Sequence, residues 1–271
     1  MRTRALVLAM VTAVQSLHAQ ASEPFLTHRD LVGMGIATLG SAAISTLDRR
    51  IALGFRDSTL RARHPGYTQG AKRASIVTET VLMAAGGLTW GVARLSHDRG
   101  TADVALHTTE SVASAAMAIQ VVRGILGRER PYVADSLGKA PDSHPYRFHL
   151  LKGFTSFADR SYPSMHAMAS FAAATALTQE MRVRHTPHRA AIGPLLYAGA
   201  AAPSLARLYL DEHWTSDIAM GIYLGVLSGQ KVVQYSHAHP DNRFDRRFLA
   251  KRTTITVTRD ARGFSLALGS L

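Results

Sequence analysis

The stretch SLARLYLDEHWTSDIAMGIYLG, residues 204–225, carries the end of one apolar helix and the start of the next. Alanine and other good helix formers extend the pattern on both sides and predict helices over residues 190–210 and 215–235. Between them, Arg207 is followed after five residues by His213, and His213 after three residues by Asp217. The stretch therefore predicts a helical fold with chemistry-bearing side chains at a helix boundary.

The rest of the chain repeats this helical pattern. Length and alanine content favour helix over strand in four more segments, residues 31–47, 76–92, 104–126 and 164–181. At the C-terminus the pattern changes to strict alternation, with Thr253 to Thr258 and Phe264 to Leu268 separated by turn residues. This alternation predicts a β-hairpin. We expect an all-α fold, a bundle of about six helices, with a short C-terminal β-hairpin.

Membrane association is harder to deduce from these helices. A span needs about 20 mostly apolar residues, and the first helix is short of that. Helices that are apolar nearly all round also suit a large soluble core. Small residues such as Gly33, Gly35 and Gly40 allow close helix packing in either solvent. We expect membrane association, with a soluble bundle as the alternative.

The N-terminus has the pattern of a secretory signal. Arg2 and Arg4 precede an apolar run over residues 5–14, and small residues follow at a plausible cleavage site after Ala19 or Ala21. The alternative is an uncleaved anchor helix. We therefore expect an exported protein, periplasmic or membrane-bound with its active site on the outer face. The expected organisation is a signal peptide (1–21), a helical domain (25–245) and a hairpin appendage (250–271).

Composition limits the chemistry. The chain has no cysteine, which excludes disulfides, thiol nucleophiles and thiolate metal sites. Its formal net charge of +12 attracts phosphates of lipids, nucleotides or nucleic acid, although an arginine-rich genome would give the same charge. Basic residues interleaved with aromatics are absent from the sequence, so nucleic acid is not an expected partner.

His213 and Asp217 are four residues apart and share one face of a helix. A carboxylate in that position can accept a hydrogen bond from one imidazole nitrogen and leave the other free as a nucleophile. The alternative is a surface ion pair, which is common and contributes little. One histidine and one aspartate make a poor zinc site, so no metal is expected there.

Two further clusters lie at helix boundaries. Arg123 is followed after six residues by Arg130, where Gly127 and Pro131 end the third helix. Cations here could simply cap that helix. In the second cluster Ser164 can cap the fourth helix, whose free N–H groups form an anion site with His166 in the first turn.

Together the three clusters resemble the signature of the type-2 phosphatidic acid phosphatase family, which includes bacterial acid phosphatases and vanadium haloperoxidases. That signature reads Lys, six residues, Arg-Pro; then Pro-Ser-Gly-His; then Ser-Arg, five residues, His, three residues, Asp. The spacings hold across residues 123–217. Three positions depart from it: Arg123 replaces Lys, Met165 replaces Gly and Ala206 replaces Ser. Met165 would add bulk beside the site and would violate any requirement for a positive φ.

The resemblance implies a phosphate-binding role for five residues. Three guanidiniums would hold the phosphate oxygens, and the Ser164 hydroxyl and the Met165 backbone N–H would complete the cradle. The arginines are Arg123, Arg130 and Arg207. Because they supply the positive charge of a divalent ion, no metal or cofactor is expected.

The resemblance also implies the catalytic residues. His213 would attack phosphorus and form a phosphohistidine, Asp217 would orient His213, and His166 would protonate the leaving group and later activate water. The expected function is hydrolysis of phosphomonoesters or diphosphates, with a lipid phosphate as the expected partner. Alternatives are a soluble broad-specificity acid phosphatase, a vanadium-dependent haloperoxidase and a non-catalytic phosphate-pocket scaffold. The polar loop over residues 128–162 would shape substrate entry.

Overall fold

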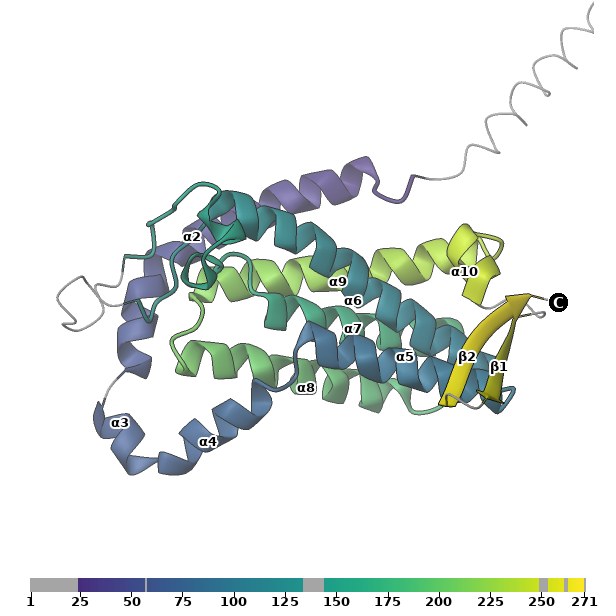
Figure 1. Ribbon diagram of the computed structural model, residues 1–271. Helices are drawn as coiled ribbons and strands as arrows, with labels where there is room; N and C mark the ends of the chain where they lie inside the picture. The colour runs from purple at the N-terminus through teal and green to yellow at the C-terminus, as the bar shows by residue number, and fades with distance from the viewer. Residues whose placement is uncertain (1–23, 57, 134–143, 249–252, 261–262, 271) are drawn as a thin grey trace, which may run out of the picture.

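Six long helices pack side by side in the computed structural model, which describes residues 24–56, 58–133, 144–248, 253–260 and 263–270 (Figure 1). They are α2 (His28–Phe55), α5 (Glu79–Leu95), α6 (Arg99–Leu126), α7 (Met165–Val183), α8 (Arg189–Tyr209) and α9 (Thr215–Ala238). The predicted helical fold class is confirmed. The expected signal peptide lies outside the described residues.

The expected count of six helices is too low. The described residues contain nine α-helices, because three short ones were missed: α3 (Ser58–Arg63), α4 (Pro65–Ala74) and α10 (Arg243–Phe248). These helices are polar and at most three turns long, so they carry no extended apolar pattern. The loop between α6 and α7 also contains two 3₁₀ helices, η1 (Lys152–Phe154) and η2 (Phe157–Asp159).

Two strands follow α10 at the end of the bundle (Figure 1). β1 (Thr253–Asp260) pairs antiparallel with β2 (Gly263–Ser270), with Thr253 opposite Ser270. In the described part of the chain these strands pair with each other and with no other strand.

Helix α7 lies at the centre of the bundle and packs against α5, α6, α8 and α9. Its alanines and methionines form the main apolar core with residues of α6 such as Val112 and Ile119. On the facing side, Gly221, Gly225 and Gly229 recur every fourth residue along α9 and so share one face. A Cβ atom on any of them would collide with the backbone or side chains of α7. Small residues therefore set the close approach of α7 and α9.

The residues at two helix ends explain where α6 stops and where α7 starts. Gly127 follows α6 in a left-handed conformation (φ 58°), and a side chain there would collide with the His149 carbonyl. Glycine adopts this conformation without steric cost, so α6 stops at the predicted position. At α7 the Ser164 hydroxyl accepts a hydrogen bond from the Ala167 N–H (3.4 Å) and caps the helix, as predicted.

Helix α2 packs mainly against α9 and leaves most of its apolar surface exposed. Of the described helices it alone is long and apolar enough to cross a membrane, and the bent pair α4–α5 passes the same test when taken together. The helix expected over residues 31–47 is longer than predicted. Thr27 caps its N-terminus, so that α2 begins at His28, and it continues to Phe55.

The glycine contacts give a test of the packing. We expect Gly225→Ala to lower the melting temperature by the equivalent of about 1–3 kcal/mol, because the added methyl group overpacks the α7–α9 contact. Gly199→Ala in α8 is the matched control: it has open space around it and should hold or raise the melting temperature. Equal melting temperatures for the two variants would show that the close approach is not needed for stability.

Candidate active site

The three predicted clusters converge at one end of the bundle. Arg123 lies in the last turn of α6, Arg207 in the last turn of α8, and Asp217 in the first turn of α9. The expectation that His213 and Asp217 share a helix face is wrong, because His213 lies in the loop that precedes α9. The clusters meet around His213: the Ser164 N–H donates to the Asp217 carbonyl (3.0 Å), and burial first, then the charges of the three arginines, lower the pKa of His213 well below its ordinary value. Segments far apart in sequence therefore enclose one site.

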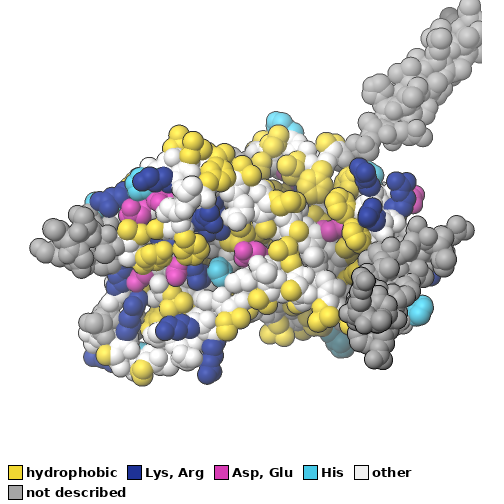
Figure 2. Space-filling model, viewed as in Figure 1, with side chains coloured by type: hydrophobic (Ala, Val, Ile, Leu, Met, Phe, Trp, Pro, Cys, Tyr) yellow, Lys and Arg dark blue, Asp and Glu magenta, His cyan; other side chains and the backbone are white. Residues whose placement is uncertain are grey.

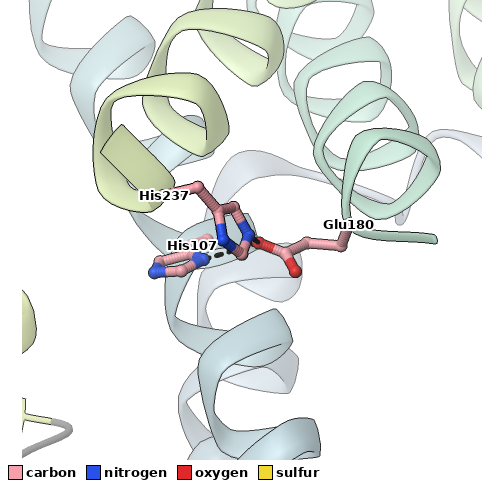
Figure 3. A group of neighbouring side chains, drawn as sticks. All are labelled: His107, Glu180 and His237. Carbon is pink, nitrogen blue, oxygen red and sulfur yellow. Dashed lines mark hydrogen bonds and ion pairs between the residues drawn. The ribbon is translucent and has the colours of Figure 1, made fainter. Parts of the chain in front are cut away.

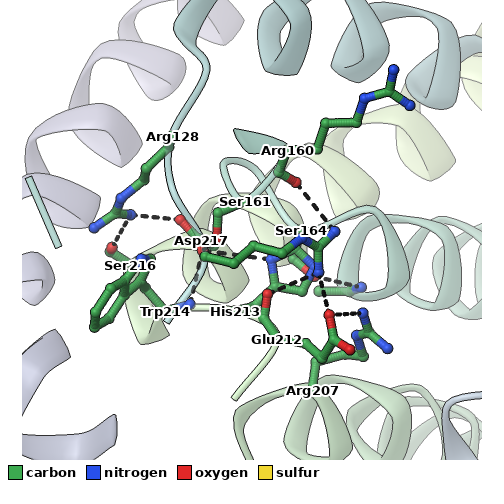
Figure 4. Close-up of polar contacts among 12 residues, drawn as sticks. Arg128, Arg160, Ser161, Ser164, Arg207, Glu212, His213, Trp214, Ser216 and Asp217 are labelled. Carbon is green, nitrogen blue, oxygen red and sulfur yellow. Dashed lines mark hydrogen bonds and ion pairs between the residues drawn. The ribbon is translucent and has the colours of Figure 1, made fainter. Parts of the chain in front are cut away.

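Asp217 is held in a fixed orientation beside His213 (Figure 4). One carboxylate oxygen accepts a hydrogen bond from Arg128 Nη1 (2.5 Å). The other accepts from Ser161 Oγ (2.5 Å) and from the Trp214 N–H (2.8 Å). His213 Nδ1 lies 3.5 Å from this second oxygen and makes no hydrogen bond in the described structure. Catalytic hydrogen bonds are often this long without substrate and shorten when it binds.

Arg128 is the residue that anchors Asp217. Its guanidinium is buried and bridges two fully buried carboxylates, Asp217 and Asp48 (2.8 Å). It also donates to Ser216 Oγ (2.8 Å) and to the Pro145 carbonyl (2.8 Å). The sequence analysis missed Arg128 and Asp48, because a separation of 80 residues gives no local pattern.

The three predicted phosphate-binding arginines are buried, and backbone carbonyls hold two of them, Arg123 and Arg130. Arg123 donates to the Arg160 carbonyl from Nε (3.0 Å) and Nη2 (2.7 Å). Arg130 donates to the Phe157 carbonyl (3.2 Å). Burial lowers the pKa of Arg123 and of Arg207 to about 10, so both remain cationic at neutral pH. A carbonyl fixes a guanidinium without neutralising it, and the positive charge stays available to an anion.

Glu212 is a carboxylate that the sequence analysis did not single out. Its Oε2 atom accepts from Arg130 Nη1 (2.6 Å) and lies 2.9 Å from Arg207 Nη2 (Figure 4). The Nε atom of Arg207 is buried and has no hydrogen-bond partner among the described residues. A tetrahedral anion binding these two arginines would have to displace or share their contacts with Glu212.

His166 lies in the first turn of α7, as predicted, and its Nε2 atom lies 3.2 Å from the Ser75 carbonyl. Burial, and then the charge of Arg207, lower the pKa of His166 to about 4. Both histidines are therefore neutral at neutral pH when no anion is bound. A neutral imidazole is the form that His213 needs as a nucleophile.

The expectation for the Met165 side chain is wrong. It does not crowd the anion site but is buried in the apolar core with Ile119 and Met168. Its φ is not positive, because Met165 is the first residue of α7. Ala206 also has a packing role and contacts Ala71 and Tyr209. Both side chains therefore belong to buried apolar clusters.

Comparison with known proteins points to one family. A model described as the PAP2 superfamily matches residues 105–240, about half of the chain and all of the predicted site residues. A search of solved structures finds the first transmembrane PAP2-type phosphatidylglycerolphosphate phosphatase from Bacillus subtilis, with 18% identity and a TM-score of 0.41, covering 75% of this chain and 98% of that chain. Comparison with curated protein sequences gives no match.

The position of Glu212 predicts competition with bound anions. We expect Glu212→Gln to tighten binding of inorganic phosphate roughly tenfold, because the variant removes a carboxylate that competes with phosphate for Arg130 and Arg207. Isothermal titration of phosphate measures this. Asp211→Asn is the matched control, since it removes the same charge one residue earlier, where Asp211 pairs with Arg56 and Arg61. An equal change in both variants would refute a specific contact.

The lowered pKa of His166 predicts a stability effect. The unfolded chain binds this proton near pH 6.5 and the folded chain only near 4, so folding loses stability as pH falls through that range. At about pH 5 the loss from this group is ~2 kcal/mol. We expect His166→Asn to lose that much less stability than wild type between about pH 7 and 5, measured by urea unfolding. Parallel losses in both proteins would contradict the assignment.

Proposed function

Since this chain belongs to the PAP2 superfamily, we propose that it is a metal-independent phosphatase that hydrolyses lipid phosphomonoesters or diphosphates through a phosphohistidine. The observation that carries the proposal is the environment of His213. This imidazole is neutral and buried, it lies beside an anchored carboxylate, and three cationic arginines surround it.

The proposed reaction has two steps. In the first, the Nε2 lone pair of His213 attacks phosphorus while the bond to the leaving oxygen breaks, and His166 donates a proton to that oxygen. Asp217 accepts the Nδ1–H of His213 and stabilises the cationic ring. In the second, His166 takes a proton from water, which attacks phosphorus and releases inorganic phosphate and free His213.

The site electrostatics support these roles. Burial and then the arginine charges keep His213 neutral, and the same arginine charges would stabilise the negative charge of the transferring phosphoryl group. His166 must be protonated to act as an acid, and its low pKa opposes this while the site holds no anion. A phosphate dianion offsets the charge of Arg207, the largest charge effect on His166, and so favours its protonation. Substrate binding would therefore supply the catalytic acid form.

A lipid substrate is supported by exposed apolar residues next to the site. In the α6–α7 loop, Phe157 stacks on the Arg130 guanidinium, 4.2 Å from its carbon to the ring centroid, and stays largely exposed. Other exposed apolar residues of this loop are Tyr146, Phe148, Leu150, Leu151 and Phe154. Figure 2 shows hydrophobic side chains over much of one face of the molecule. With α2, these residues suit a membrane-associated enzyme that takes a phosphate headgroup from the bilayer surface.

We also propose that the protein is exported and works on the outer face of a membrane. The N-terminal signal pattern supports this proposal. The alternative, a soluble broad-specificity phosphatase, differs in its substrate range. It would hydrolyse p-nitrophenyl phosphate at least as fast as any lipid phosphate.

The test is phosphate release from phosphatidate, an isoprenyl diphosphate and p-nitrophenyl phosphate. We expect His213→Ala to abolish release from all of them, because the nucleophile is lost. His166→Ala should reduce it by about 10²–10⁴-fold, and least with p-nitrophenyl phosphate, whose leaving group needs no proton. His28→Ala, on the exposed start of α2, is the matched control and should keep the wild-type rate.

Labelling with ³²P-substrate distinguishes the mechanism from other hydrolyses. His166→Ala should accumulate acid-labile label on the protein, since activation of water is impaired, and His213→Ala should carry none. Turnover by His213→Ala at the wild-type rate would exclude the proposed nucleophile. Phosphate binding without turnover of any substrate would instead indicate a non-catalytic pocket.

A further inference from the structure

A second polar cluster lies at the opposite end of the same helices (Figure 3). It contains His107 of α6, Glu180 of α7 and His237 of α9. At 1.5 Å per residue, His107 is roughly 24 Å from Arg123 along α6, and His237 is roughly 30 Å from Asp217 along α9. The proposed phosphatase chemistry does not use these three side chains.

The three side chains point at one another. Glu180 Oε1 lies 2.6 Å from His107 Nδ1 and 2.9 Å from His237 Nε2. All three ligand atoms lie within 4.8 Å of one another, the spacing of atoms that share a metal ion. The second oxygen of Glu180 accepts a hydrogen bond from Arg184 Nε (2.8 Å), which fixes the carboxylate.

A second, independent observation concerns the other nitrogen of His107. His107 Nε2 lies 3.5 Å from Asp245 Oδ1, and both atoms are buried without a hydrogen bond in the described structure. Asn242 donates to the other oxygen of Asp245 (2.6 Å) and orients it. A carboxylate behind the non-ligating nitrogen is the usual support of a metal-bound histidine.

The two nitrogens of His107 face two carboxylates, Glu180 and Asp245, and a neutral ring can donate a hydrogen bond to only one of them. If Nδ1 of a neutral ring donates its proton to Glu180, the lone pair of Nε2 faces the Asp245 carboxylate, and the two repel. If Nδ1 ligates a metal, the proton must reside on Nε2, where it faces Asp245 as a donor. Metal binding to Nδ1 therefore satisfies both nitrogens of His107, as a cationic imidazolium that donates to both carboxylates also does, so a metal ion and a proton compete for Nδ1.

We propose that His107, Glu180 and His237 bind a divalent transition metal ion. Two imidazoles and one carboxylate match Zn²⁺, which takes three protein ligands and water in its open position, whereas Mg²⁺ and Ca²⁺ prefer oxygen ligands alone. The ion can enter from solvent, because the His237 side chain is 32% exposed. It would join α6, α7 and α9 directly and α10 through Asp245, as a structural clamp far from the phosphatase site.

Zinc binding to the full-length protein tests this proposal. The protein is purified in detergent with an affinity tag that contains no histidine, stripped with EDTA, and titrated with Zn²⁺ against a chromophoric chelator. We expect one Zn²⁺ per chain and a higher melting temperature with zinc, because the ion binds the folded state. Co²⁺ in its place should give the visible absorption of a tetrahedral site.

Three variants make the result specific. His237→Gln removes a partly exposed ligand and should fold while losing zinc binding and the zinc-dependent rise in melting temperature. Asp245→Asn should weaken binding by about 10–100-fold, because it removes only the support of His107. His239→Gln is the matched control: it is two residues from His237, and its Nδ1 contacts the Tyr235 carbonyl of its own helix.

The zinc titration of these variants has results that support the site and results that contradict it. Loss of binding in His237→Gln with wild-type binding in His239→Gln supports the site. Absence of saturable zinc binding in the wild type, or equal zinc binding in wild type and His237→Gln, overturns it. Phosphatase activity is not the readout, so this result does not depend on the function proposed for the other end of the bundle.

Discussion

The candidate active site depends on one buried ionic bridge, Arg128 between Asp48 and Asp217. The three side chains come from α2, the α6–α7 loop and α9, so the bridge joins segments that no short connection links. Two buried carboxylates without this arginine would leave uncompensated charge, and breaking such a pair typically costs about 3–5 kcal/mol. With it, the Asp217 carboxylate cannot rotate, and the position of His213 relative to the arginines is fixed.

The same site concentrates positive charge without neutralising it. Backbone carbonyls of Arg160 and Phe157 hold Arg123 and Arg130, and only Glu212 supplies a carboxylate to this group among the described residues. The cost of burying these guanidiniums is visible in their lowered pKa values. Burial first, and then that field, lower the pKa of both histidines, so an arriving anion meets neutral imidazoles and cationic donors. The arginine charges thus contribute both to anion binding and, together with burial, to keeping the histidines neutral.

Sequence patterns predicted the parts of the fold and of the candidate site that depend on local rules. Ser164 and Gly127 signal helix ends through capping chemistry. His213 and Asp217 do not share a helix face as expected, because His213 lies in the loop before α9 and only Asp217 is helical. Partners distant in sequence left no such signal. The contact of Asp48 with Arg128 and the pairing of Glu212 with two arginines depend on how the helices pack. The direction of Met165 was misjudged for the same reason, since only the packed bundle shows that its side chain lies in the core.

Packing also explains why polar groups gather at the ends of the bundle. Along the middle of α7 and α9, alanines and glycines bring the backbones close together, and the buried polar side chains there are small hydroxyls such as Ser170 and Thr175. Helix ends are different, because free backbone groups and loop carbonyls supply hydrogen bonds there. Ser164 begins α7 at one end and Glu180 lies near its other end. A rigid apolar middle therefore fixes both polar clusters on one frame and keeps the chemistry of each end separate.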